Sequence, residues 1–147
     1  MRILGLDLGT RTLGLALSDL TETIASFYGT IRFDEGDFNS AIEKLNDIVS
    51  KENVSLFVLG LPKNMNNSLG DAADRSLKFR EMLEKRFNIE VIMQDERLTT
   101  VEATSYLLES DMSRKKRKSK VDGLSAVLIL QTYLDRKRWD YGRKNDI

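Results

Sequence analysis

The order of the apolar segments along the 147-residue chain constrains the fold most. The first 33 residues contain three strand-like segments in direct succession, and the later segments alternate between helix-like and strand-like patterns. Consecutive strands joined by short turns pair antiparallel, whereas a helix between two strands allows them to run parallel. The order therefore predicts a single α/β domain over residues 1–147, with a mixed five-stranded sheet and helices on both faces.

The strands are predicted from their side-chain patterns. Ile3–Leu8 is short and apolar, and in Leu13–Ser18 leucines alternate with small residues, which predicts a hairpin turning at Gly9–Arg11. Ile24–Phe33 is rich in aromatic and β-branched residues and is predicted as a third antiparallel strand. The two remaining strands are predicted at Leu56–Leu59, ended by Gly60-Leu61-Pro62, and at Glu90–Gln94.

Helical periodicity and charge predict the other elements. Asp37 is positioned to cap a helix whose apolar residues recur at helical spacing from Phe38 to Val49. Lys63–Gly70 is polar and predicted as a loop, followed by a helix over Ala72–Phe87. The last predicted elements are a helix opened by Thr99, a charged connector at about 113–120, a helix over Val121–Leu134 and a polar tail at about 136–147.

Polar segments follow three strands that are predicted to be parallel. Ligands of open α/β sheets bind at the carboxyl ends of such strands, which points to Asp7, Gly60–Pro62 and Asp95–Arg97. A carboxylate at the end of a buried strand is costly unless it is hydrogen-bonded or binds a cation. Asp7 therefore either accepts hydrogen bonds from the Gly9-Thr10 turn or binds a ligand.

Only one carboxylate of the pair Asp95 and Glu96 can share a face with Asp7, because side chains alternate along a strand. We choose Glu96; the alternative is a solvated strand end or an ion pair with Arg97. Asp122 is the third candidate, at the start of the last predicted helix. The pattern Ser119-x-x-Asp122 also fits a helix cap, so a purely structural role for Asp122 stays open.

The chain has neither His nor Cys. This excludes Ser-His and Cys-His catalytic pairs, disulfides and imidazole or thiolate metal ligands. Converging carboxylates from Asp7, Glu96 and Asp122 would instead form an all-oxygen site, which suits Mg²⁺ or Mn²⁺. Such ions promote phosphodiester cleavage, so the composition is compatible with a nuclease.

The formal net charge of zero conceals two regions of opposite charge. Residues 1–113 contain 12 basic and 19 acidic side chains, whereas residues 114–147 contain 11 basic and 4 acidic ones. Most of the excess lies in a basic run of six cations: Arg114, Lys115, Lys116, Arg117, Lys118 and Lys120. Such a run neutralises phosphates and predicts nucleic-acid contact, with a solvated connector as the alternative.

The N-terminal residues lack the pattern of a signal peptide, because their apolar stretch is short and contains Asp7. No uncharged apolar run approaches the roughly 20 residues that a membrane span requires. We therefore expect a soluble, cytoplasmic protein without a membrane partner.

Four blocks, taken in order, resemble the YqgF (RuvX) family of RNase H-like nucleases, which are homologues of Holliday-junction resolvases. The blocks are Gly5–Asp19, Gly60–Asn66, Asp95–Ala103 and Lys120–Leu134. The resemblance implies an RNase H-like sheet, with three antiparallel strands and then two strands parallel to the first. It implies catalytic, metal-ligating Asp7, Glu96 and Asp122, and substrate contacts from Arg11, Gly60, Pro62, Asn64 and Arg97. Arg97 could equally pair with a neighbouring carboxylate.

The chain departs from the family pattern at two places. Asn67 stands where the family often has Gly. Ser125 and Ala126 occupy the region where related resolvases carry a further carboxylate, which leaves three carboxylates for metal.

The leading hypothesis is a metal-dependent endonuclease acting on structured RNA, in 5′-end maturation of pre-16S rRNA. Its expected partners are pre-rRNA and ribosomal particles, and its expected state is a monomer or weak homodimer. The alternatives are a ribosome-assembly factor that binds nucleic acid with little or no cleavage, and a DNA-junction resolvase. Asp7-x-Gly9-Thr10 also resembles the first phosphate loop of actin-like ATPases, but those enzymes need two such domains and 147 residues form one.

Overall fold

The structure is a computed structural model that describes residues 2–62, 70–95 and 123–137. The described chain contains β1 (Arg2–Leu8), β2 (Thr12–Ser18), β3 (Ala25–Arg32), α1 (Phe38–Lys51), β4 (Val54–Leu61), α2 (Asp71–Phe87) and β5 (Val91–Asp95). Residues 123–137 form a further helical segment, called segment 123–137 below. The predicted helix opened by Thr99, the charged connector and all of the predicted loop Lys63–Gly70 except Gly70 lie outside the described residues.

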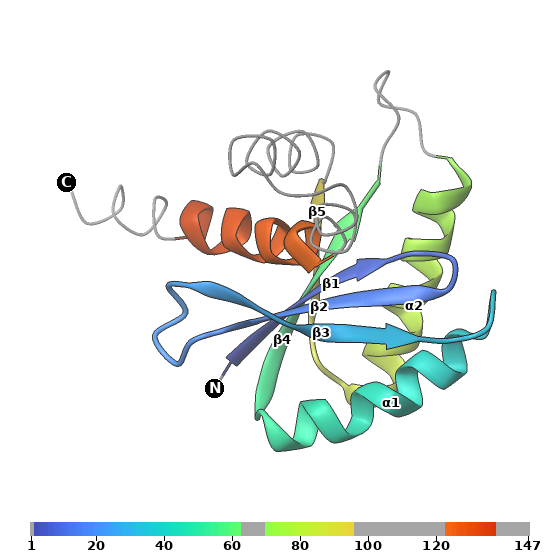
Figure 1. The fold of residues 1–147 in the computed structure, drawn as a ribbon, viewed down its shortest axis with the longest axis horizontal. Coiled ribbons are helices and arrows are strands. Elements are labelled where there is room, and N and C mark those ends of the chain that lie inside the picture. The colour runs from blue at the N-terminus through green and yellow to red at the C-terminus, as the bar shows by residue number, and fades with distance from the viewer. Residues whose placement is uncertain (1, 63–69, 96–122, 138–147) are drawn as a thin grey trace, which may run out of the picture.

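The five strands form one mixed sheet in the order β3-β2-β1-β4-β5. β1 pairs antiparallel with β2, and β2 with β3, whereas β1–β4 and β4–β5 are parallel. The predicted sheet is therefore confirmed, including the two parallel strands. In the view of Figure 1, α1 runs along the lower side of the sheet and segment 123–137 along its upper side.

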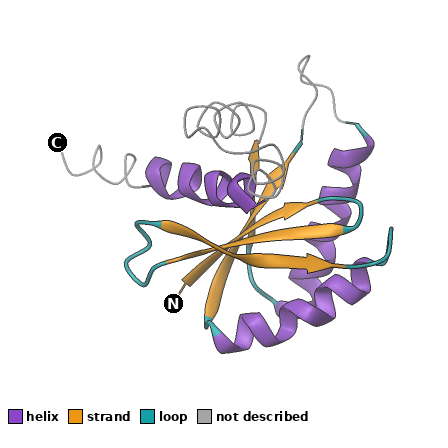
Figure 2. Ribbon diagram, in the orientation of Figure 1, coloured by secondary structure: helices purple, strands orange, loops and turns teal. Residues whose placement is uncertain are grey.

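The two faces of the sheet bury separate clusters. Leu4, Leu6, Phe57 and Leu59 belong to the larger cluster, which is completed by α1 and α2. Ile3, Ala16 and Val58 belong to the smaller one, which is completed by Ala126, Ile129, Leu130 and Leu134 of segment 123–137. Helices cover both faces, as predicted (Figure 2).

Local signals locate several element ends. Asp37 caps α1, and its carboxylate accepts a hydrogen bond from the Ser40 N–H at 3.3 Å. The hairpin between β1 and β2 closes through the Gly9 N–H, which donates to the Thr12 carbonyl at 2.7 Å. Both features were predicted from the sequence.

The predicted end of β4 was wrong. The strand continues through Gly60 and Leu61, because both residues pair with β5: Gly60 with Gln94 and Leu61 with Asp95. It stops before Pro62, which has no N–H to donate to a strand partner. Segment 123–137 likewise continues three residues beyond the predicted end at Leu134.

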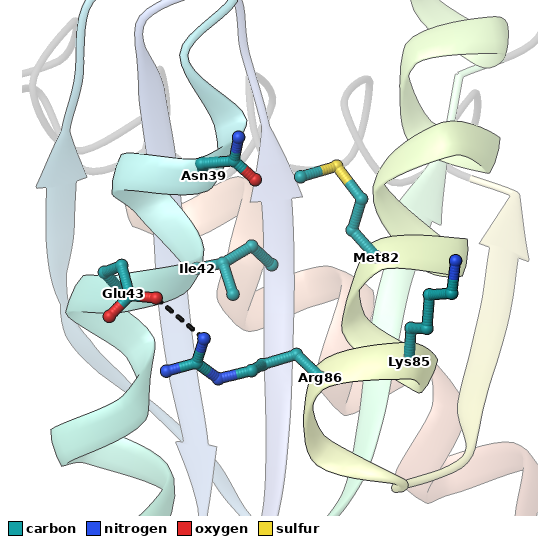
Figure 3. A pocket seen from close by; sticks show the side chains of 6 residues that line it. All are labelled: Asn39, Ile42, Glu43, Met82, Lys85 and Arg86. Atoms are coloured by element: carbon teal, nitrogen blue, oxygen red, sulfur yellow. Dashed lines mark hydrogen bonds and ion pairs between the residues drawn. The ribbon is translucent and has the colours of Figure 1, made fainter.

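A groove of about 330 Å³ lies between α1 and α2, away from the cluster of segment 123–137. Arg86 donates across it to Glu43 at 2.7 Å, and Ile42 and Met82 contribute apolar side chains (Figure 3). None of the described helices is long and apolar enough to span a membrane.

Candidate active site

Asp7 lies on the face of the sheet that segment 123–137 covers. In β1 the odd-numbered Ile3 belongs to that cluster, whereas the even-numbered Leu4 and Leu6 belong to the opposite one. Because side chains alternate along a strand, Asp7 shares the face of Ile3. Its side chain is only partly buried, one residue before the carboxyl end of β1.

Glycines occupy the positions next to Asp7 in both neighbouring strands. Gly14 of β2 lies directly opposite Asp7. On the other side, Leu6 of β1 pairs with Leu59 of β4. The next residue of β4, Gly60, therefore lies at the level of Asp7. Gly60 in turn pairs with Gln94 of β5, whose side chain is 6% exposed. The adjacent strands therefore add no side chain beside the carboxylate at its own level.

Two of the three predicted polar strand ends are thus brought together. Asp7 and Gly60 lie in adjacent parallel strands, and Pro62 follows β4 directly. This is the arrangement expected at the carboxyl edge of a parallel pair. The predicted contact residue Arg11 lies in the adjoining β1–β2 turn. Its guanidinium is 3.4 Å from Glu35, and both side chains are largely exposed, so this ion pair is weak.

The remaining predicted site residues lie outside the described residues: Glu96, Asp122, Asn64, Arg97, Arg114, Lys115, Lys116, Arg117, Lys118 and Lys120. β5 ends at Asp95, and segment 123–137 begins immediately after position 122. Among the described residues, no three Asp or Glu side chains gather in a way that could hold a metal ion. The three-carboxylate site therefore stays a prediction, of which the structure describes Asp7.

Close contact at Gly5 sets how near segment 123–137 lies to the sheet. A Cβ atom on Gly5 would be 2.7 Å from the Leu130 Cβ and 3.2 Å from the Ala126 carbonyl oxygen. A glycine is therefore required for the helix backbone to approach β1 this closely. A glycine inside an apolar strand is the sequence signal for such an approach, but the sequence does not reveal which element approaches.

Gln131 fixes the same helix to the start of β3, a contact that sequence reasoning missed. Its Oε1 accepts from the Ala25 N–H at 2.8 Å, and its Nε2 donates to the Thr23 carbonyl at 3.0 Å. Nε2 also donates to Asp135 at 3.0 Å. The side-chain amide thus pairs with one backbone group of β3 and one of the β2–β3 connection, and sets the position of the helix along the sheet.

Asp19 organises the connection between β2 and β3. Its carboxylate accepts hydrogen bonds from the backbone N–H groups of Ile24 and Thr23 at 3.0 and 2.8 Å and from the Thr21 hydroxyl. These donors favour the ionised form and lower the pKa of Asp19 from 3.8 to about 2, with the Ile24 N–H contributing most. The connection that Gln131 binds is therefore itself held by a charged side chain.

Solved structures that share this arrangement of elements include RNase H-fold resolvases. A Thermus thermophilus RuvC bound to a Holliday junction substrate matches with a TM-score of 0.59 at 11% identity, over 93% of this chain and 96% of that one. The Fowlpox virus resolvase in complex with Holliday junction DNA matches with a TM-score of 0.53 at 14% identity, over 92% and 98% of the two chains. At these identities the likeness establishes the fold class.

Sequence comparison establishes the family. Residues 1–136 match the family described as "RuvX: Holliday junction resolvase". Proteins named "Putative pre-16S rRNA nuclease" are similar: one from Oceanobacillus iheyensis is 47% identical over 137 residues, covering 93% of this chain and 100% of that protein. One from Enterococcus faecalis is 48% identical over 136 residues, covering 92% and 97%. The chain belongs to the RuvX family, which confirms the predicted resemblance and the predicted class, a resolvase-like nuclease.

Proposed function

We propose that this chain is a metal-dependent endonuclease that cleaves structured RNA in 5′-end maturation of pre-16S rRNA. The observation that carries the proposal is Asp7, a partly buried carboxylate at the carboxyl end of β1 with glycines on both sides. The names of the similar proteins supply the substrate class. We infer cytoplasmic action on pre-rRNA or ribosomal particles, by a monomer or weak homodimer.

The donor chemistry around Asp7 fits a hard divalent cation. Carboxylate oxygens are the preferred ligands of Mg²⁺ and Mn²⁺, and the strand positions on both sides of Asp7 at its level are glycines. Asp7, Glu96 and Asp122 would hold the ion. When bound, it supplies Lewis-acid stabilisation of the phosphate charge and lowers the pKa of the attacking water.

The described part of β5 has the side-chain parity that the choice of Glu96 assumes. Ile92 packs with the cluster on the face of Asp7, and Val91 packs with the opposite cluster. The even-numbered Gln94 of the described strand therefore shares the face of Asp7, and the proposal takes Glu96, the next even-numbered residue in the sequence, as the ligand. This parity agrees with the choice made from the sequence alone.

The other site residues have binding roles in this proposal. Arg11 and Arg97 contact phosphates, and the Gly60–Pro62 strand end with Asn64 lies alongside the substrate. The basic run from Arg114 to Lys120 holds the phosphate backbone without selecting a sequence. Replacing its cations with Gln should weaken binding for all sequences alike and reduce the dependence of affinity on salt.

A purified-protein cleavage assay tests the proposal, using end-labelled precursor RNA with Mn²⁺ or Mg²⁺. Asp7→Asn should lower the cleavage rate at least about 1,000-fold, because a carboxylate ligand and its ion contribute several kcal/mol. Asp47→Asn makes the same chemical change at an exposed position of α1 and is the matched control. Undiminished cleavage by Asp7→Asn, or by the wild-type chain in excess chelator, would contradict the mechanism.

One observation favours a second function, RNA binding with little or no cleavage in ribosome assembly. Ser125 and Ala126 stand where related resolvases carry a further carboxylate, and both are buried, at 7% and 0% exposure. Under this alternative, Asp7→Asn leaves RNA binding and the cellular rRNA phenotype unchanged. A four-way DNA junction in the same assay distinguishes resolvase activity from RNA cleavage.

A further inference from the structure

The large apolar side chains exposed among the described residues are grouped in the β2–β3 connection and β3. They are Leu20, Ile24, Phe27 and Tyr28. Phe27 differs from the others because it pairs with Ala16, a member of the cluster under segment 123–137. Cross-strand partners project to the same face of a sheet, so Phe27 shares the face of Asp7 although it is 56% exposed.

The Phe27 ring is held against the start of segment 123–137. A Cβ atom on Gly123 would be 2.7 Å from the ring Cε1 and 2.8 Å from Cδ1. The ring therefore lies over a backbone position that has no side chain. Because the residue is still 56% exposed, one part of the ring is supported by protein and another part faces solvent. This is a positioned, flat apolar surface.

The separation of Phe27 from Asp7 follows from the strand register. Phe27 pairs with Ala16, which pairs with Gly5, so Phe27 is two strands away from Gly5. Asp7 is two residues further along β1. With strands about 4.8 Å apart and about 3.4 Å per residue, the two backbone positions are roughly 12 Å apart. That distance equals the rise of about three to four stacked nucleotides.

We propose that Phe27 is a stacking platform for an unpaired nucleobase of the strand whose phosphate lies at Asp7. The inference rests on the proposed function, because it needs a nucleic-acid strand on this face. Exposed aromatic rings bind unpaired bases by stacking, with little dependence on base identity. Leu20 and Ile24 lie in the connection that precedes β3, away from the carboxyl end of β1, and have no part in this contact.

Binding of a 12-nucleotide single-stranded RNA tests the proposal, measured with the full chain in the Asp7→Asn background so that no cleavage occurs. Phe27→Ala should weaken binding about 5- to 150-fold, the range known for one stacked base. Phe27→Leu keeps apolar bulk against Gly123 but loses the flat ring, and should weaken binding comparably. Phe27→Trp should retain affinity. Ile24→Ala, which removes an apolar side chain that is 59% exposed, is the matched control and should change affinity less than about twofold.

Abasic nucleotides locate the stacked base. An RNA lacking the base at one position should lose the same affinity as Phe27→Ala, and the two losses should not add. Full additivity at every position, or unchanged affinity for Phe27→Leu, would overturn the proposal. A second result would also overturn it: Phe27→Ala and Ile24→Ala both abolish self-association in sedimentation, and neither changes RNA affinity. The exposed apolar side chains of β3 and the β2–β3 connection would then bind a second copy of the chain. The wild-type cleavage assay reads the proposed function separately, because stacking affects binding whether or not the bound strand is cut.

Discussion

The two faces of the sheet are built differently, and the difference separates stability from the candidate chemistry. In the described residues, the face covered by α1 and α2 buries a cluster with four phenylalanines, Phe33, Phe38, Phe57 and Phe79. The cluster under segment 123–137 consists of aliphatic residues, several of them alanines. Small residues bring that helix close to the sheet, and Asp7 lies on the same face. One face therefore provides most of the apolar burial, and the other carries Asp7, the described residue of the proposed site.

The largest expected effect is on the aromatic face. Phe79 is fully buried, and its ring centroid lies 5.7 Å from that of Phe38 in an edge-to-face arrangement. Phe79→Ala should lower the free energy of unfolding by about 3–5 kcal/mol, because it removes apolar contacts and leaves a cavity. Urea unfolding measures the loss. Asp7→Asn is the comparison on the other face and should change stability by less than about 1 kcal/mol. If Asp7→Asn lowered the free energy of unfolding more than Phe79→Ala, the aromatic face would not be the main source of stability.

A smaller effect is expected where segment 123–137 approaches β1. Gly5→Ala places a Cβ atom 2.7 Å from the Leu130 Cβ, so the helix must shift, at a cost of about 1–3 kcal/mol for overpacking. Under the proposed function RNA cleavage should fall as well, since the proposed ligand Asp122 directly precedes this segment in the sequence. Gly29→Ala is the matched control: a Cβ there meets nothing within 4 Å, and stability should stay equal or rise by about 0.4–1 kcal/mol. Equal urea midpoints for the two variants would show that this close contact does not constrain the helix.

The attachment of Gln131 to β3 should contribute less again. Gln131→Met keeps the length of the side chain but leaves the Ala25 N–H and the Thr23 carbonyl without these partners. The expected loss is about 1–2 kcal/mol, the cost of partly buried polar groups without hydrogen bonds. Asp135→Asn changes only the outer contact of the same amide and should cost less than about 0.5 kcal/mol. Thermal unfolding at neutral pH compares the two, and a greater loss for Asp135→Asn would contradict this role of Gln131.

The sequence predicted the sheet because its signals are local. Alternation, apolar runs and the Asp37 cap each depend on neighbouring residues, and the carboxyl-end rule correctly brought Asp7 and Gly60 into adjacent strands. Glu96, Asp122 and the basic run lie outside the described residues and stay predictions of the sequence and the family resemblance.

Other features had no local signal. The bonds of Gln131 join residues 106 and 108 positions apart, and they exist only once the helix has its position on the sheet. The face of Phe27 depends on a bulge: the register between β2 and β3 shifts at Leu15/Ala16, so Phe27 pairs with Ala16 and Gly29 with Leu15. An extra residue of this kind changes which positions share a face, and simple alternation does not reveal it.

The smallest expected effect is the loss in acid of the stabilisation that Asp19 provides, and it tests how segment 123–137 depends on the β2–β3 connection. Because the folded-state pKa of Asp19 is lowered to about 2 from 3.8, its ionised form stabilises the folded chain above the higher value. That contribution should be lost as the pH falls from about 4 to about 2. Asp19→Asn cannot ionise, so the difference in urea midpoint between the wild-type chain and this variant should be constant near neutral pH and shrink over that range. Carbon NMR of the Asp19 carboxyl group reports its titration directly, and a midpoint near 3.8 would contradict the lowered pKa.

A double-mutant comparison tests whether Asp19 and Gln131 act together. Since Asp19 binds the N–H groups of Thr23 and Ile24, beside the groups that Gln131 binds, the effect of Asp19→Asn on stability should be smaller in a Gln131→Met background. Full additivity would mean that the connection and the helix are stabilised independently.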